Sequence, residues 1–435
     1  MPAALTAQII LYTISSVCYN ILFHPLRNFP GPFWMRATRM TYCYKLMGGN
    51  LPFEMLDIHK KYGTVVRIAP NELAFGDPNA WNEIMGHRVG AKKGPEFEKS
   101  TAFYRPMGGP SDIVNSGGDE HATLRRLMSH GFSSRSLKEQ EPLIMKYVDL
   151  LTQRLHQNCD KTVDIMSWYN YTTFDLIGDL AFGEPFGCLN NSDYHPWVKT
   201  IFQMARLGTV FQTASYFPLL RSLIIRVLST KKIRARKLQH ATMTKEKLLR
   251  RMELGKAGGR PDLIDNLLRK KDELGMTMDQ VVKNAGVLII AGSETTATVL
   301  SGVTYLLLKN SKALSKLTEE VRTTFQSEEE IDLTSVNKLS YMLACLDEAL
   351  RMYPPIAGGL SRVCPEGGAT VSGRFIPENT IVAIHQWAMY HNENHWSDPM
   401  EFRPERFIDS VAYQKDRRDS LQPFHLGPRN CLGRK

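Results

Sequence analysis

The longest apolar stretch of this chain has a carboxylate at its centre, and this combination constrains the fold more than any other feature. "TMDQVVKNAGVLIIAGSETTATVLSGVTYLLLKN" runs from Thr277 to Asn310, and Thr277 with Gln280 forms the T-x-x-Q capping box that begins a helix. A helix this long and this apolar is either the core of a large domain or a membrane span. Glu294 would cost several kcal/mol against lipid. We therefore predict a core helix, loosened around "GSETT", that turns this carboxylate toward an internal cavity.

The composition indicates a globular protein with a sizeable core, because 43% of the 435 residues are hydrophobic and 23% are charged. The 54 lysines and arginines exceed the 44 aspartates and glutamates, which gives a net charge of +10. No recognition motif for nucleic acid accompanies this charge, so we expect no nucleic-acid partner. An acidic protein or an anionic lipid surface stays open as a partner. The seven cysteines are odd in number and include no C-x-x-C pair, which argues against disulfides and zinc and fits a reducing compartment.

The first 23 residues contain no Asp, Glu, Lys or Arg and predict a membrane anchor. "LTAQIILYTISSVCYNILF" is just long enough to cross the bilayer as a helix. A cleaved signal peptide is the alternative, although it would need a basic start and a small-residue cleavage site. Basic residues follow this segment and none precede it, which predicts a cytoplasmic body. The chain is thus divided into an anchor (1–23), a proline-rich, non-helical hinge (24–36) and a body (37–435).

The body reads as mainly helical with small β-sheets. "YGTVVRIAPNELAFG" predicts two strands around a Pro-Asn turn, and "ATVSGRFIPENTIVAIHQWAM" predicts strand, turn, strand. Between them a helical stretch extends from about Asp119 to Ser229. Within it, Ser136 and Glu139 match a capping box for a helix that begins near Leu137.

Two motifs in the last hundred residues carry paired charges. Glu348 and Arg351 are three residues apart in "SYMLACLDEALRMYPP", and Arg406 follows in "FRPERF". Taken alone, the first pair is a solvated i,i+3 ion pair worth a few tenths of a kcal/mol. The alternative is a buried triad of all three side chains, which survives in a protein interior only as a satisfied network.

The chain closes on "FHLGPRNCLGRK", in which a thiol stands among glycines and an arginine. A lone cysteine is more often a small buried hydrophobe than a ligand. Here Gly427 and Gly433 let the backbone approach a flat group, Arg429 suits an anion, and Phe424 can shield the sulfur from water. These surroundings predict that Cys431 is a soft anionic ligand for a metal in a planar cofactor.

Four motifs in order, "AGSETT", "EALR", "PERF" and "FHLGPRNCLG", resemble those of the cytochrome P-450 superfamily of haem-thiolate monooxygenases. "FHPL", "KYGTVVRIAPNELAF" and "HWSDPMEFRPERF" are similar to fungal enzymes of secondary metabolism, such as trichothecene hydroxylases. The resemblance implies a cytochrome P-450 fold, mainly α with small β-sheets, and a haem-binding catalytic domain over residues 37–435. The implied reaction inserts one oxygen atom of dioxygen into a hydrophobic small molecule.

The resemblance also implies a set of partners. The cofactor would be haem (heme b), and NADPH would supply electrons through a separate NADPH-cytochrome reductase. The chain would be a single-pass protein of the endoplasmic reticulum membrane with its catalytic domain in the cytoplasm.

The resemblance assigns roles to individual residues. Cys431 would be the axial thiolate ligand of the iron, flanked by Phe424, Gly427 and Gly433. Glu294 and Thr295 would deliver protons. The structural triad would be Glu348, Arg351 and Arg406, and the haem carboxylates would bind His121, Arg125, Arg362 and Arg429.

The sequence departs from the family pattern after Cys431. In the family a long helix and a small sheet follow the cysteine loop, whereas this sequence has only "LGRK". We therefore expect a C-terminally incomplete domain, and a catalytically dead remnant is one alternative function. A haem-thiolate isomerase or lyase is another, against which the intact Glu294-Thr295 pair argues.

Overall fold

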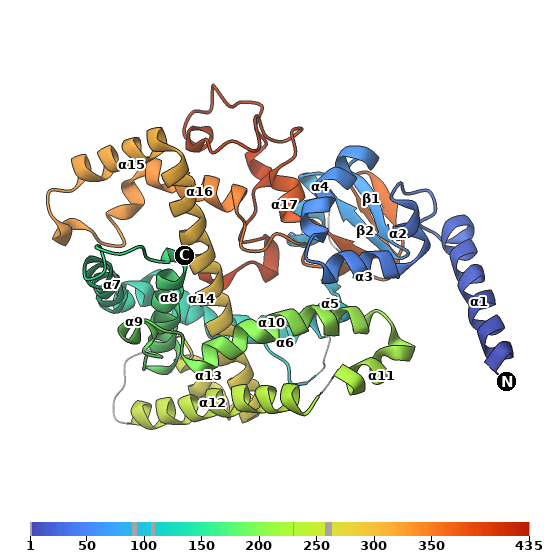
Figure 1. The fold of residues 1–435 in the computed structure, drawn as a ribbon, viewed down its shortest axis with the longest axis horizontal. Helices are drawn as coiled ribbons and strands as arrows, with labels where there is room; N and C mark the ends of the chain where they lie inside the picture. The colour runs from blue at the N-terminus through green and yellow to red at the C-terminus, as the bar shows by residue number, and fades with distance from the viewer. Residues whose placement is uncertain (1, 89–93, 106–108, 229, 257–262, 435) are drawn as a thin grey trace.

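A computed structural model describes residues 2–88, 94–105, 109–228, 230–256 and 263–434. It has a large helical part and a smaller part built around a sheet, with one N-terminal helix projecting away from both (Figure 1). The fold is mainly helical with small sheets, as the sequence predicted. The helices of the larger part are α6 (Gly118–Ser129), α7 (Ser134–His156), α8 (Ile165–Phe182), α9 (Cys188–Asn191), α10 (Pro196–Ser215), α11 (Pro218–Leu228), α12 (Lys231–Lys256), α13 (Asp265–Lys270), α14 (Met278–Lys309), α15 (Ser311–Thr324) and α16 (Ser340–Met352).

Helix α14 is the core helix that the sequence predicted. Thr277 and Gln280 form a reciprocal capping box at its start, and it packs along α8, where a Cβ on Gly292 would lie only 2.8 Å from Ile177. The predicted loosening is wrong, because α14 is continuous through "GSETT". Its hydroxyls are satisfied within the helix instead: Ser293 Oγ donates to the Ile289 carbonyl at 2.5 Å.

Among the residues that the structure describes, two helices are long and apolar enough to cross a membrane, and their burial differs. The segment Thr6–Phe23 has none of its residues buried, whereas the qualifying window within Met278–Lys309 is 39% buried. Helix α1 (Pro2–Cys18) continues into a π-helical turn, η1 (Tyr19–Phe23), and projects into solvent (Figure 1).

The proposed hinge at 24–36 packs more closely against the body than a free hinge would. Leu26 and Phe29 are buried in the core beside the sheet, and a Cβ on Gly31 would lie 2.2 Å from the Arg67 carbonyl oxygen. The end of the segment is helical, since α2 (Phe33–Ala37) begins inside it. Helices α3 (Arg39–Met47) and α4 (Leu51–Tyr62) follow.

The main sheet joins strands from distant parts of the sequence in the order β1-β2-β7-β4-β3. The predicted antiparallel pair around Pro70-Asn71 is confirmed as β1 and β2. The later prediction of two strands is incomplete: β5 and β6 form a separate hairpin, and a third strand, β7, pairs in parallel with β2. The strands are β1 (Val65–Ala69), β2 (Glu72–Phe75), β3 (Glu98–Lys99), β4 (Arg362–Val363), β5 (Ala369–Val371), β6 (Arg374–Ile376) and β7 (Ile381–Ala383).

Short elements connect the sheet to the cysteine loop. They are η2 (Trp81–Met85), α5 (Thr101–Tyr104), α17 (Gln386–Tyr390), η7 (Pro404–Phe407), η8 (Arg418–Ser420), η9 (Gly427–Arg429) and η10 (Leu432–Arg434), with η4 (His130–Phe132), η5 (Glu328–Glu330) and η6 (Val336–Lys338) elsewhere.

The capping box predicted at Ser136 and Glu139 is wrong. Helix α7 begins one turn earlier at Ser134, and its N-cap is Ser133, whose side chain accepts from the Ser136 N–H at 3.2 Å. The sequence "SSRS" (133–136) contains three serines that could cap a helix. Because the preceding turn, η4, ends at Phe132, the helix begins directly after it and Ser133 is the cap.

Candidate active site

The cysteine loop is closed by its own backbone. The Cys431 N–H donates to the Phe424 carbonyl at 2.8 Å. Gly427 has φ +72°, and a Cβ there would lie 2.0 Å from the Met85 carbonyl oxygen, so this glycine is required by packing against η2. We had predicted that it permits close approach of a flat group; the structure gives it another physical reason. A Cβ on Gly433 would meet nothing nearer than the Cys431 Sγ at 3.9 Å.

The thiol of Cys431 is exposed although protein surrounds it on most sides. Desolvation raises its pKa, while the Gly433 N–H and the Arg125 guanidinium act in the opposite direction. Cys345 and Cys364 differ, because both are buried and desolvation raises their thiol pKa values to about 12 and about 11. Cys431 therefore combines access with two groups that favour a thiolate.

Helix α6 is tied to the cysteine loop through one arginine. Arg125 Nη1 donates to the Asn430 carbonyl at 2.6 Å, and its Nη2 donates to the Asn430 side chain. This contact joins residues 305 positions apart in sequence. It places the face of α6 that carries Arg125 next to the cysteine loop.

Four cationic side chains converge on a buried histidine of α6. His121 is 6% exposed, and its pKa is lowered to about 4 by burial and then by Lys99, Arg429, Arg125 and Arg362. Burial also lowers the pKa of Lys99 to about 7, helped by two of these arginines. His121 is thus neutral at pH 7 beside an excess of positive charge.

Some of these cations already have protein partners. Arg429 pairs with Glu96 at 2.7 Å and with Glu98 at 3.1 Å, but its buried Nε has no partner. Arg362 Nη1 donates to the Tyr104 hydroxyl at 2.6 Å.

Three acidic side chains, Glu96, Glu98 and Asp112, act on these four cations. One positive charge is therefore left over, and such a charge is costly to remove from water. The arrangement fits a cofactor that brings anionic carboxylates of its own. Lys99 is part of this set, and sequence reasoning did not assign it. "FEKS" carries no motif, so only the pairing of β3 with β4, which sets Lys99 opposite Arg362, reveals it.

The carboxylate and hydroxyl of "AGSETT" lie on α14. Glu294 has one buried carboxylate oxygen, Oε1, without a partner, and burial raises its pKa. Thr295 Oγ1 donates to the Ala291 carbonyl at 2.6 Å. Ile290 is 41% exposed whereas Ile289 next to it is fully buried, so one face of this core helix is partly open in its middle among the described residues. Neither Glu294 nor Thr295 has a hydrogen bond to the cysteine loop among the described residues.

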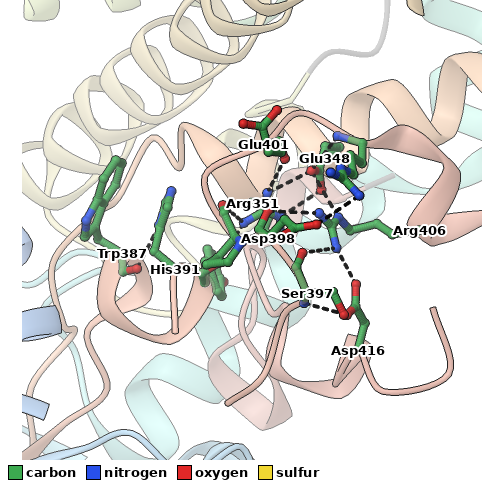
Figure 2. Close-up of polar contacts among 12 residues, drawn as sticks. Glu348, Arg351, Trp387, His391, Ser397, Asp398, Glu401, Arg406 and Asp416 are labelled. Carbon is green, nitrogen blue, oxygen red and sulfur yellow. Dashed lines mark hydrogen bonds and ion pairs between the residues drawn. The ribbon is translucent and has the colours of Figure 1, made fainter. Parts of the chain in front are cut away.

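Glu348, Arg351 and Arg406 lie together in one buried network, which Figure 2 shows. Glu348 accepts from Arg351 Nε at 2.7 Å and Nη2 at 2.8 Å, and from Arg406 Nε at 3.1 Å. All three side chains are fully buried. Glu348 and Arg351 therefore lie on the buried face of α16, and the interpretation as a solvated pair is excluded.

The network has a fourth charged member that the sequence motif does not contain. Asp416 accepts from Arg406 Nη1 and also from the Ser397 N–H at 2.7 Å. Two carboxylates thus balance two guanidinium groups, which satisfies the requirement for burying such charges (Figure 2).

Comparison with known proteins identifies the family of this chain. The family described as Cytochrome P450 matches residues 29–435. Cytochrome P450 monooxygenase tpeC of Talaromyces stipitatus is 46% identical over 98% of this chain and 84% of its own length. Cytochrome P450 monooxygenase prhB of Penicillium brasilianum is 44% identical over 99% of this chain and 88% of its own length. Trichothecene C-15 hydroxylase of Fusarium sporotrichioides is 41% identical over 97% of this chain and 86% of its own length.

These matches confirm the resemblance that the four motifs indicated, and the family brings with it a haem iron as cofactor. The cation cluster beside Cys431 fits such a group, because haem carries both an iron for the thiolate and carboxylates for the cations. The chain therefore belongs to the cytochrome P450 family of haem-thiolate monooxygenases.

Proposed function

We propose that this chain is a membrane-anchored monooxygenase that oxidises a hydrophobic small molecule, with Cys431 as the axial ligand of the haem iron. The observation that carries the proposal is the accessible thiol of Cys431 next to a cluster of cations, of which Arg362 is buried and Lys99, Arg125 and Arg429 are partly buried. When bound, the haem supplies the activation of dioxygen; the protein must hold it, exclude water and supply protons.

Two groups of residues would hold the haem. The thiolate of Cys431 would bind the iron, favoured by the Gly433 N–H and the Arg125 guanidinium. The haem carboxylates would lie among His121, Arg362 and Arg429, and we add Lys99 to this set because it approaches both arginines.

Glu294 and Thr295 would handle protons at the open face of α14. Burial favours the protonated form of Glu294, so this carboxyl group can carry a proton in an interior that would otherwise exclude charge. The Thr295 hydroxyl donates its proton to the Ala291 carbonyl and keeps its lone pairs available to accept another.

The N-terminal part would bind the endoplasmic reticulum membrane, with the body in the cytoplasm. Helix α1 is apolar and none of its described side chains is buried. Helices α2 and α3 add exposed apolar side chains close to it: Trp34 is 66% exposed, Met40 61% and Tyr44 77%. Aromatic side chains of this kind favour the headgroup region of a bilayer. The proposal keeps the division into an anchor (1–23) and a catalytic domain (37–435), with residues 24–36 packed on the domain between them.

Electrons would come from NADPH through an acidic flavoprotein reductase. The sequence offers five basic side chains of α6 and α7 as its docking surface: His121, Arg125, Arg126, Arg135 and Lys138. His121 is buried and Arg125 is bound to Asn430, so the exposed cations Arg126, Arg135 and Lys138 are the ones available for docking.

The substrate class is proposed from the relatives. Trichothecene C-15 hydroxylase acts, by its name, on C-15 of a trichothecene. A hydrophobic fungal metabolite is therefore the class to screen, and hydroxylation or epoxidation is the expected outcome.

The test combines a haem assay with a dithionite-reduced CO spectrum of the full chain in microsomes. A red-shifted Soret band that is lost in Cys431→Ala supports the proposal, and haem without this band argues against thiolate ligation. No haem at all would indicate the remnant. Substrate conversion that needs neither NADPH nor dioxygen would indicate an isomerase or lyase.

A further inference from the structure

His425 is held rigidly inside the cysteine loop, six residues before Cys431. Its side chain is buried and its backbone has φ +57°, a conformation that histidine adopts more readily than most residues. The ring of Trp81 packs edge-on against it, with 5.0 Å between centroids and 84° between planes. Trp81 is itself fixed, because its Nε1 donates to the Ser420 carbonyl at 3.0 Å.

A second contact determines where the imidazole proton lies. Gln386 Nε2 is 2.9 Å from His425 Nε2, and both side chains are buried. An amide nitrogen donates and does not accept, so His425 Nε2 is the acceptor in this orientation of the Gln386 amide. Burial, followed by the nearby Arg362, lowers the pKa of His425 to about 3 and keeps the ring neutral. A neutral ring that accepts at Nε2 carries its proton on Nδ1.

This Nδ1–H is buried and has no hydrogen-bond partner in the protein. A buried donor left unsatisfied is costly, and protein interiors rarely contain one without a reason. Arg362, the neighbour that acts electrostatically on His425, also belongs to the cation cluster around His121. The donor therefore lies at the edge of the region where we propose that the haem carboxylates bind.

We propose that Gln386 fixes the Nδ1–H tautomer of His425 so that this N–H donates to a haem carboxylate next to Arg362. The pair thus positions the cofactor without ligating the iron. This inference rests on the proposed haem site and adds two residues to it: Gln386, which lies outside the four motifs, and His425, to which the motif "FHLGPRNCLG" had assigned no role. The same donor could meet a small inorganic anion or a water, and the experiments below separate these cases.

The tautomer can be measured directly. In a sample with 15N-labelled histidine, two-bond 1H–15N correlations report which ring nitrogen is protonated, and the His425 signals are assigned by their loss in His425→Phe. We expect a protonated Nδ1 that becomes a mixture with Nε2–H in Gln386→Met, which removes the amide donor. A wild-type His425 protonated at Nε2 would overturn the proposal.

Haem retention tests the carboxylate contact with a matched pair of variants. His425→Phe keeps an aromatic ring against Trp81 but removes the donor. His425→Asn loses the ring, tolerates positive φ, and puts an amide N–H close to the original Nδ1. A hydrogen bond to a charged group is worth about tenfold or more in an equilibrium constant. We expect haem transfer to excess apo-globin about tenfold faster from His425→Phe, and within about twofold of wild type from His425→Asn.

The outcomes also separate this inference from the proposed function. If wild type and both variants show the thiolate CO band and release haem at the same rate, the His425 contact is wrong and the haem site stands. If wild type binds no haem, the proposed function itself fails. A wild-type release rate that matches His425→Phe in chloride-free buffer and slows only with added phosphate or chloride would assign the donor to a small inorganic anion and overturn the carboxylate contact. If His425→Phe releases haem as fast as wild type does, while wild type still shows the Nδ1–H signal of His425, the partner of this donor is a water and the carboxylate contact is overturned.

Discussion

Replacing Glu348 by Gln should destabilise the fold more than almost any other single isosteric change. The carboxylate of Glu348 accepts four hydrogen bonds, from Arg351 Nε and Nη2, from Arg406 Nε, and from the Arg403 N–H at 3.0 Å. Both arginine side chains are fully buried. Glutamine keeps the shape of the side chain but removes its negative charge and one acceptor oxygen.

The magnitude follows from the charge balance of the network. Two guanidinium groups are neutralised by Glu348 and Asp416, so the substitution leaves one buried positive charge without compensation. Removing one partner of a buried pair costs about 3–5 kcal/mol. At about 2.1 cal/mol/K of unfolding entropy per residue, 435 residues make each kcal/mol worth about 1 °C in Tm. We therefore expect Tm to fall by roughly 3–5 °C.

The matched control is Glu393→Gln, which breaks an ion pair of the same chemistry at the surface. Glu393 pairs with Lys60 at 2.7 Å, and the two side chains are 68% and 43% exposed. Such a pair contributes at most about 1 kcal/mol, so its Tm should change by about 1 °C or less.

The assay is a thermal unfolding scan of the wild type and both variants at equal haem content. Haem content is checked by absorbance, because a bound cofactor raises the apparent stability of the folded state. Should Glu348→Gln not accumulate as folded protein, Asp416→Asn is the milder test, since Arg406 keeps Glu348 as a partner. Equal Tm values for Glu348→Gln and Glu393→Gln would refute the reasoning, because burial would then have no effect on the cost.

Three further predictions address the thiolate, the proton path and acid stability. Cys431→Ala should abolish the thiolate CO spectrum while Cys345→Ala leaves it intact, since only the first thiol is accessible beside Arg125; an unchanged Cys431→Ala spectrum would end the assignment. Thr295→Ala should divert NADPH consumption from product to hydrogen peroxide, whereas Thr298→Ala, which loses the same kind of hydroxyl-to-carbonyl bond, should stay coupled; peroxide yields that match between the two contradict the proton role. His385 is fully buried, and burial followed by a neighbouring histidine lowers its pKa to about 3 from 6.5, so only the unfolded state binds its proton between these values. Its contribution to stability is therefore lost as the pH falls below 6.5, by about 1.4 kcal/mol per pH unit. The denaturation midpoint of His385→Phe should depend less on pH than that of wild type, and parallel curves for the two proteins would disprove this.

The sequence by itself determined the family and the long core helix. The four motifs are short runs of adjacent residues, so their spacing is visible without any structure. The capping box at Thr277 and Gln280 and the pair of strands around Pro70-Asn71 are likewise local, since residues close in sequence settle them. The apolar character of α14 predicted its burial for the same reason.

Local patterns failed where a distant segment decided between alternatives. The hydroxyl that caps α7 depends on where the preceding turn ends, so Ser133 and not Ser136 is the cap. Gly427 stays a predicted site of approach to a cofactor, but the sequence did not show that packing against the Met85 carbonyl also requires a glycine there. "GSETT" looked like a helix break, but its hydroxyls bond to the helix that carries them.

Only the tertiary structure decided which charged and polar groups meet. Asp416 completes the network of Glu348, and the pairing of two short strands brings Lys99 to the cations of the proposed haem site. Gln386 reaches His425 across 39 residues of sequence. Long-range packing brings such partners together. Because an unsatisfied buried polar group is costly, each buried donor or acceptor must contact a matching partner. A short sequence motif cannot predict which donor will face which acceptor, because the pairing depends on how the helices and strands between the two residues fold.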